Sequence, residues 1–194
     1  MRKVYLKQRL GFTLIEMLVT MAILSLLATM VLIYSHRTET LSNLIRDADK
    51  LVFKLHQAQS SSMLTLEQSQ TDGNTICGWG IHLNKGNMSQ NEYILFSDFC
   101  NSGVQNQYDS GEEVETIKLL RGVEIFKSNI SDVVFIPPNP SVRFTNFGPD
   151  EENDDSAWIC LRLVGQEENK PYYRIRIASS GQIYKEFKES SNVK

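Results

Sequence analysis

The sequence has few of the residues that build metal centres and catalytic sites. Only three Cys and three His occur among 194 residues, which is too few for a zinc module. No glycine-rich loop of the kind that holds phosphate groups is present, and no His stands in a recognisable setting with a Ser or Cys nucleophile. These absences argue against catalysis, so we expect no enzyme, no cofactor and no metal site.

The sequence also lacks the positive net charge of a general nucleic-acid-binding protein. Its formal charge is −3 at pH 7, which opposes attraction to phosphate. The charge is uneven, because the first eleven residues contain four basic side chains and no acidic one; these are Arg2, Lys3, Lys7 and Arg9. The rest of the chain therefore carries −7. A basic leader before a hydrophobic run points to a membrane or export function.

Neither Gly nor Pro occurs between Phe12 and Asp72, so the backbone permits one continuous helix there. Residues 12–35 carry a single formal charge, Glu16. This run is long enough to span a bilayer, which takes about 20 residues, and too long for the hydrophobic region of an ordinary secretory signal, about 7–15 residues. We expect a single transmembrane segment with the basic leader in the cytoplasm.

Glu16 is the unusual residue of this run. A carboxylate at mid-bilayer costs about 2.5–3.5 kcal/mol on insertion scales, and somewhat less near the edge. It therefore predicts a cationic partner at similar depth; the alternative is an edge carboxylate that reaches back to water. Gly11 lies where the leader meets the apolar run, and cleavage after Gly11 would turn Phe12 into a positively charged N-terminus within reach of Glu16 of the same or a neighbouring copy.

Residues 8–24, QRLGFTLIEMLVTMAIL, resemble the class III signal of type IV pilins and type II secretion pseudopilins. The resemblance implies that prepilin peptidase removes the leader, residues 1–11, by cutting between Gly11 and Phe12. It implies that the new amine of Phe12 is N-methylated. It also implies that Glu16 pairs with the N-terminus of a neighbouring subunit during filament assembly.

Beyond the membrane segment, residues 36–70 are predicted to continue the helix in amphipathic form. Apolar residues recur at i, i+3, i+4 and i+7, the period of one helix face. They are Leu41, Leu44, Ile45, Ala48, Leu51, Val52, Leu55 and Ala58, with Arg46, Asp47, Asp49, Lys50 and Lys54 on the other side. We therefore expect the apolar face of the helix to pack against a hydrophobic core and the charged face to contact water.

Residues 71–194 are predicted to form an antiparallel β head, which makes the fold class α+β. Alternating apolar residues and turn signals mark short strands. The expected strands are Ile76–Leu83, Tyr93–Phe99, Thr116–Phe126, Val133–Ile136, Val142–Phe147, Ala157–Val164, Tyr172–Ala178 and Ile183–Phe187. We expect residues 179–182 to form the turn of a last hairpin, and the sheet to pack on the apolar stripe of the helix.

The strand region more loosely resembles the H-type (GspH/FimT-like) minor pseudopilins. The order and spacing of its elements carry this likeness, among them Cys77–Gly80, Tyr93–Asp98 and the closing residues 177–183. The resemblance implies a minor pseudopilin or minor type IV pilin, held in the inner membrane with its head in the periplasm or outside the cell. The partners it implies are prepilin peptidase and other pilin subunits. A DNA-binding minor pilin for DNA uptake and a major pilin are the alternatives.

Two of the three cysteines fall on neighbouring predicted strands. If residues 76–83 and 93–99 form a hairpin centred near residue 88, Ile81 lies opposite Phe96 and Cys77 opposite Cys100, close enough for a disulfide. Cys160 would then be the free thiol. The alternative is that the thiols are reduced and buried. Disulfides persist outside the cytoplasm, where the resemblance places this head.

Charged clusters in the head have a plain and a functional interpretation. We expect the two acidic clusters to lie in solvated loops; they are Asp109, Glu112, Glu113 and Glu115, and the acidic residues at 150–155. Calcium binding is the less favoured alternative, because neither cluster has the ligand spacing of a known calcium loop. Basic residues alternate with aromatic ones near the C-terminus, and the candidate DNA contacts are Arg174, Arg176, Lys185 and Lys188. A solvated strand face is favoured there, so nucleic acid is not an expected partner.

Overall fold

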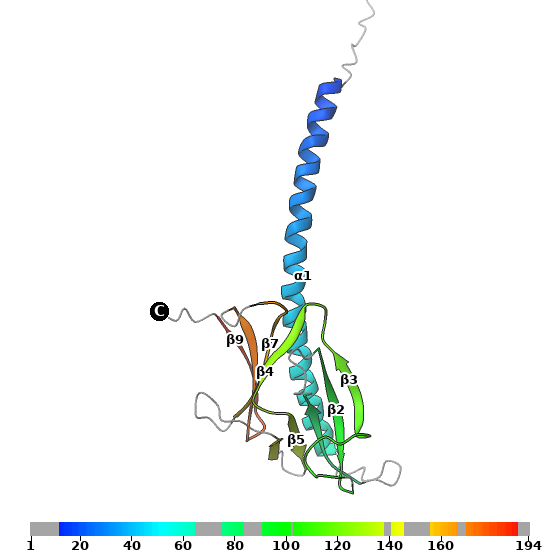
Figure 1. The fold of residues 1–194 in the computed structure, drawn as a ribbon, viewed down its shortest axis with the longest axis vertical. Coiled ribbons are helices and arrows are strands. Elements are labelled where there is room, and N and C mark those ends of the chain that lie inside the picture. Colours follow the sequence, from blue (N-terminus) through cyan, green and yellow to red (C-terminus); the bar gives the residue numbers. More distant parts are fainter. Residues whose placement is uncertain are drawn as a thin grey trace, which may run out of the picture. The chain divides into compact units, whose positions relative to one another are not determined.

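A computed structural model describes residues 12–64, 75–83, 91–101, 103–137, 141–145, 156–166 and 170–189. The chain divides into two compact units, residues 1–39 and residues 40–194. A single helix, α1 (Leu14–Leu64), contributes to both (Figure 1). It agrees with the expected continuous helix up to Leu64, and the expected continuation to residue 70 lies outside the described residues.

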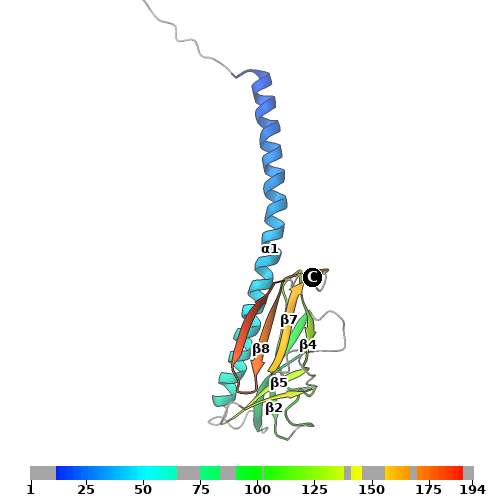
Figure 2. The same ribbon diagram turned by 90° about the vertical axis from the view of Figure 1, so that its left-hand side faces the viewer.

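The second unit contains nine strands in two antiparallel sheets. The five-stranded sheet has the order β3-β2-β1-β5-β6, and the four-stranded sheet has the order β4-β7-β8-β9 (Figure 2). The strands are β1 (Ile76–His82), β2 (Glu92–Phe99), β3 (Glu113–Lys118), β4 (Val123–Ser128), β5 (Asp132–Ile136), β6 (Ser141–Thr145), β7 (Ser156–Leu163), β8 (Tyr172–Ala178) and β9 (Ile183–Lys188). The predicted fold class, α+β with an antiparallel β head, is confirmed.

One predicted strand is wrong. Residues 116–126 were expected to form a single strand, but they divide into the end of β3 and the start of β4. The chain turns at Arg121 and Gly122, where Gly122 has φ of +87°, a conformation that favours glycine. This turn moves the chain from one sheet to the other, so the head has two sheets instead of the one expected. The final hairpin is confirmed: β8 and β9 pair through a turn in which Gly181 has φ of +83°.

The apolar stripe of α1 within residues 40–64 builds the core of the head. Its fully buried members are Leu44, Ala48, Leu51, Leu55 and Ala58, which join core residues of both sheets in one cluster. The edges of the stripe differ from the prediction. Leu41 and Ile45 are 49% and 37% exposed, whereas Asp47, expected on the polar side, is buried.

Polar contacts hold the same stretch of α1 against both sheets. Lys54 forms an ion pair with Glu115 of β3 at 2.6 Å, and Asp49 pairs with Lys185 of β9. The side-chain amide of Gln59 donates to the carbonyl of Gly181 at 3.1 Å. The helix therefore lies against an outer strand of each sheet, and the core closes between them.

Candidate functional site

The side chain of Thr13 caps the start of α1. The hydroxyl of Thr13 accepts a hydrogen bond from the backbone N–H of Glu16 at 3.3 Å, and the carbonyl of Thr13 accepts one from Met17 at 3.2 Å. Thr at the N-cap and Glu three residues later is a preferred helix start. The Thr-x-x-Glu spacing therefore places Glu16 in the first turn, at the positive end of the helix dipole.

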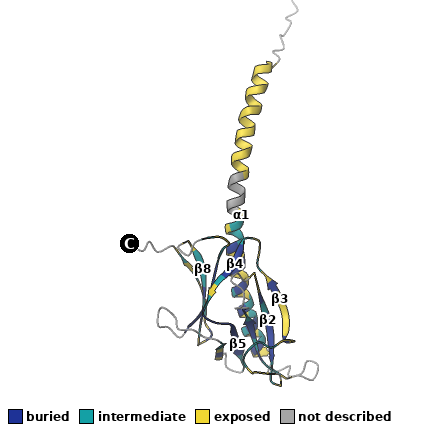
Figure 3. Ribbon diagram, in the orientation of Figure 1, coloured by how far each residue is buried: buried dark blue, intermediate teal, exposed yellow. Residues whose placement is uncertain are grey.

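The helix that follows is apolar on all sides. Residues 14–32 have a mean hydropathy of 2.2 and are long and apolar enough to cross a membrane. None of this span is buried within the chain, and Figure 3 shows it exposed along its length. In the described part of the chain, the carboxylate of Glu16 makes no hydrogen bond or ion pair. The segment thus presents an unpaired acid near the end of an apolar surface that the protein itself does not cover.

The family model for the prokaryotic N-terminal methylation motif matches residues 6–32. The match includes the leader junction, the capped first turn and Glu16. In this segment the chain is similar to proteins that carry the prokaryotic N-terminal methylation motif. Phe12, the residue after the predicted cleavage point, is 77% exposed. Gly11 lies outside the described residues, so cleavage and methylation at this junction stay predictions.

Comparison with whole proteins adds little beyond this segment. No curated protein matches the chain. Among solved structures, it is similar to the type IV minor pilin FimU of Pseudomonas aeruginosa strain PAO1, with 14% identity and a TM-score of 0.46 over 79% of this chain and 92% of that one.

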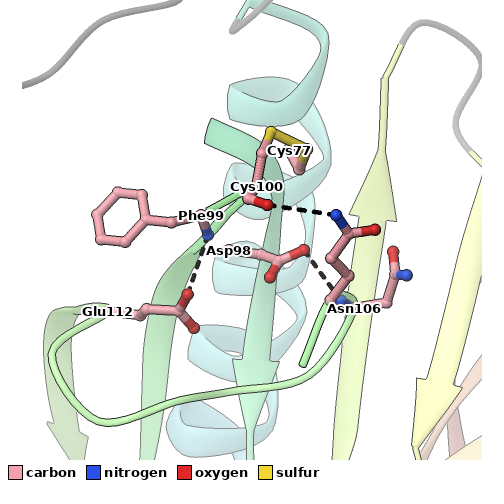
Figure 4. Close-up of a disulfide and its surroundings, with 7 residues drawn as sticks. Cys77, Asp98, Phe99, Cys100, Asn106 and Glu112 are labelled. Atoms are coloured by element: carbon pink, nitrogen blue, oxygen red, sulfur yellow. Dashed lines mark hydrogen bonds between the residues drawn. A yellow bond between two sulfur atoms is a disulfide. The ribbon is translucent and has the colours of Figure 1, made fainter. Parts of the chain in front are cut away.

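The head contains a disulfide between Cys77 and Cys100 (Figure 4), with the Cα atoms 5.1 Å apart. The hairpin that carries it differs by one residue from the expected register, because Ile81 lies opposite Leu95 and not opposite Phe96. The register shifts again between Ile76 and Gly78, which makes Cys77 a bulge residue. From this bulge Cys77 bonds to Cys100, whose N–H donates to the carbonyl of Thr75 at 2.8 Å. Cys160 is buried and forms no disulfide.

After Cys100 the chain folds back over the five-stranded sheet. We call residues 103–112 the strap. The N–H of Asn106 donates to Asp98 on β2 at 3.1 Å, and its carbonyl accepts from Thr145 on β6 at 3.2 Å. Tyr108 stacks on His82 of β1, with ring centroids 4.4 Å apart. The strap therefore touches three strands of this sheet.

The acidic residues of the strap and β3 have separate partners. Glu112 accepts from the N–H groups of Phe99 and Asp109 at 3.0 and 2.9 Å, and Asp109 accepts from Val104 at 2.9 Å. Glu113 accepts from the hydroxyl of Tyr108; this bond and burial raise the pKa of Tyr108 to about 12, and the bond lowers the pKa of Glu113.

These carboxylates stabilise the turns of the strap. Among the described residues, no three His, Cys, Asp or Glu side chains are grouped to hold a metal ion. The second acidic run, residues 150–155, lies outside the described residues.

The candidate DNA contacts do not form one free basic surface. Arg176 and Lys188 lie 3.6 and 3.2 Å from the carboxylate of Glu186, and Lys185 pairs with Asp49. Arg174 lies over the ring of Trp158, 5.5 Å from its centroid. Strand alternation places Lys185 on the opposite face of the sheet from the other three.

Sequence reasoning missed Asp98. It lies next to Ser97 on β2 and is only 1% exposed. The strap residues that bury it are up to fourteen positions away, in a segment without an apolar pattern, so strand alternation alone gave no sign of its burial. The one available signal was that Asp98 stands two residues before a predicted disulfide cysteine.

Proposed function

We propose that this pilin-like protein is a minor subunit of a filament, either a type II secretion pseudopilus or a type IV pilus, in which it helps to initiate or cap the fibre. The observation that carries the proposal is the exposed apolar helix with Glu16 in its capped first turn. Cleavage after Gly11 would place the amine of Phe12 about one helical turn from Glu16. An apolar helix that the chain leaves uncovered suits a membrane before assembly and a bundle of helices afterwards.

Glu16 provides specificity in this proposal. An unpaired carboxylate is costly among apolar helices, and an amine from a neighbouring Phe12 removes that cost. The attraction between the Glu16 carboxylate and the Phe12 amine then favours one axial position of a subunit relative to its neighbour. A buried polar pair fixes the register of a coiled coil in the same way. In this proposal prepilin peptidase first removes the leader. The processed subunit then stays in the inner membrane until assembly, and the β head faces away from the filament axis.

The test compares Glu16→Ala with Glu39→Ala, a matched change at an exposed acid on the same helix. We expect both full-length variants to be processed to the same mature mass in the native host. The amount of Glu16→Ala in sheared filaments should fall at least about tenfold, which corresponds to ~1.4 kcal/mol, while Glu39→Ala incorporates normally. Normal incorporation of Glu16→Ala would overturn the pairing role.

A DNA-binding role is the second candidate carried by the sequence. The ion pairs of Arg176, Lys185 and Lys188 weigh against it, since each would have to be exchanged for a phosphate contact. A gel shift across a salt series separates the two roles, because phosphate contacts weaken steeply with salt.

A further inference from the structure

The strap closes over a carboxyl group that has lost most of its contact with water. Asp98 is 1% exposed, and one oxygen, Oδ2, accepts the hydrogen bond from Asn106. The other oxygen, Oδ1, is buried and has no hydrogen-bond partner. Figure 4 shows Asp98 with Asn106 and Glu112 of the strap around it. A buried carboxylate with an unpartnered oxygen is costly as long as it is ionised.

The charges around Asp98 increase this cost. Glu112, only 2% exposed, and Asp109 both act on Asp98 with the same negative sign. The residue paired with Asp98 on β1 is Gly78, which has no side chain to offer. In the described part of the chain, no cation forms an ion pair with Asp98. On the same face of the sheet, Nδ1 of His82 lies 2.6 Å from the carboxylate of Asp132, and the ring of His82 stacks on Tyr108 of the strap.

These surroundings favour the neutral form of the carboxyl group. Burial is the largest cause that raises the pKa of Asp98, and Glu112 and Asp109 raise it further; the Asn106 N–H opposes them, and the pKa reaches about 6. An ionised Asp98 can regain water only if the strap lifts. The strap is the part free to do so, because its contacts with the sheet are a few hydrogen bonds and the ring of Tyr108, whereas β2 is paired on both sides.

We propose that Asp98 is a proton-binding site and that the strap, residues 103–112, is a proton-controlled cover on the five-stranded sheet. It is held closed while Asp98 carries a proton and opens more readily when Asp98 ionises. Lifting the strap exposes Phe96, which is buried outside the main core and whose ring lies against Tyr108 with centroids 5.5 Å apart. The exposed surface would be apolar, and its availability would rise with pH.

The size of the effect follows from the two pKa values. If Asp98 has its ordinary pKa of 3.8 with the strap open and about 6 with it closed, the opening constant rises about tenfold between pH 5 and pH 7.5. Hydrogen exchange measured by mass spectrometry on the full-length protein in detergent reports this constant, after correction for the intrinsic effect of pH. We expect the tenfold change in strap peptides and none in peptides from β8.

Asp98→Asn removes the charge and nearly keeps the shape. Because its side chain is neutral whether the strap is open or closed, the strap of this variant should be at least about tenfold more protected than that of the wild type at pH 5, with less than about a twofold pH effect. Asp49→Asn, at an exposed carboxylate on α1, should behave as the wild type. If Asp98→Asn does not fold, the change in wild-type exchange between pH 5 and pH 7.5, compared between strap and β8 peptides, still tests the proposal. Equal strap protection at both pH values would overturn the proposal, and so would a pH effect that persists in Asp98→Asn, because a group other than Asp98 would then be the sensor.

Discussion

The carboxylate of Asp47 on α1 accepts a hydrogen bond from the backbone N–H of Leu120 at 2.7 Å. Leu120 lies in the link where the chain leaves β3 for β4, so this bond fixes the passage between the two sheets against the helix. Next to it, the side-chain amide of Asn43 donates to the carbonyl of Arg121 at 3.3 Å. Two polar residues of the helix thus satisfy backbone groups in a link that has no strand partner for them.

Replacing Asp47 tests how much this contact contributes. Asp47→Ala removes the acceptor of the Leu120 N–H, and we expect the free energy of unfolding of the head to fall by about 1–3 kcal/mol. Asp47→Asn keeps an accepting oxygen and should lose less. Denaturant titration followed by tryptophan fluorescence measures both, since Trp79 and Trp158 lie in the head. Equal losses in the two variants would show that the hydrogen bond is not what stabilises the link.

The same residue makes stability depend on pH. Burial raises the pKa of Asp47 above its ordinary value of 3.8, more than the Leu120 N–H and Lys50 lower it. A raised folded-state pKa means that the folded protein holds this proton more tightly than the unfolded one. Its stabilising contribution is therefore complete below pH 3.8 and is lost as pH rises through the folded-state pKa. Asp47→Asn should reduce this loss in the same titration repeated from pH 3.5 to 7.

The contact of Asp47 also shows where sequence reasoning ends. The apolar segment, the helix and most strands follow from local hydropathy and periodicity, and Glu16 follows from the motif of residues 8–24. Asp47 was assigned to the solvent face because its helix neighbours are charged, yet its partner is 73 residues away. The division of residues 116–126 depends on the same link, since only Arg121 and Gly122 signal a turn within an otherwise regular strand pattern. Burial by distant backbone cannot be predicted from periodicity.

The disulfide can be tested by counting thiols. The unreduced, denatured protein should show one free thiol, Cys160, and three after reduction. Removing the bridge with Cys77→Ser and Cys100→Ser together should lower the free energy of unfolding by about 3 kcal/mol, because the bridge closes a loop between residues 23 positions apart. In the native state Cys160 should react slowly with thiol reagents because it is buried. Three thiols without reductant would refute the pairing.

Gly80 tests the packing between β1 and the face beneath the strap. A Cβ atom there would overlap the carbonyl oxygen of Val133 and come within 2.8 Å of the ring of Phe96. Gly80→Ala should therefore destabilise the head by about 1–3 kcal/mol, as overpacking does. Ser141→Ala, on the exposed side of β6 in the same sheet, should change stability by less than about 0.5 kcal/mol. The same denaturant titration compares them, and a similar small effect for both would contradict the close packing.

Processing at the leader is tested by Gly11→Val. A bulky side chain before the cleaved bond should prevent removal of residues 1–11, so the membrane fraction should contain only the unprocessed chain, and Phe12 should remain unmethylated. Intact-mass measurement of the purified full-length protein distinguishes the forms. Thr13→Ala is the matched control, because it weakens the helix cap by about 1 kcal/mol without changing the cleaved bond, and it should be processed. A mature mass unchanged in Gly11→Val would remove the basis for cleavage at this junction.

Abundance separates a minor subunit from a main one. Because Glu16, the apolar span and the leader are features that both kinds of subunit need, the N-terminal segment alone does not distinguish them. Quantitative mass spectrometry of sheared filaments distinguishes them. It measures the amount of this protein relative to the most abundant pilin-like subunit. We expect a trace ratio, as for a subunit that starts or caps a fibre. Near-parity would make this protein the main building block, and the proposed initiating role would then be wrong even if cleavage and the Glu16 pairing both hold.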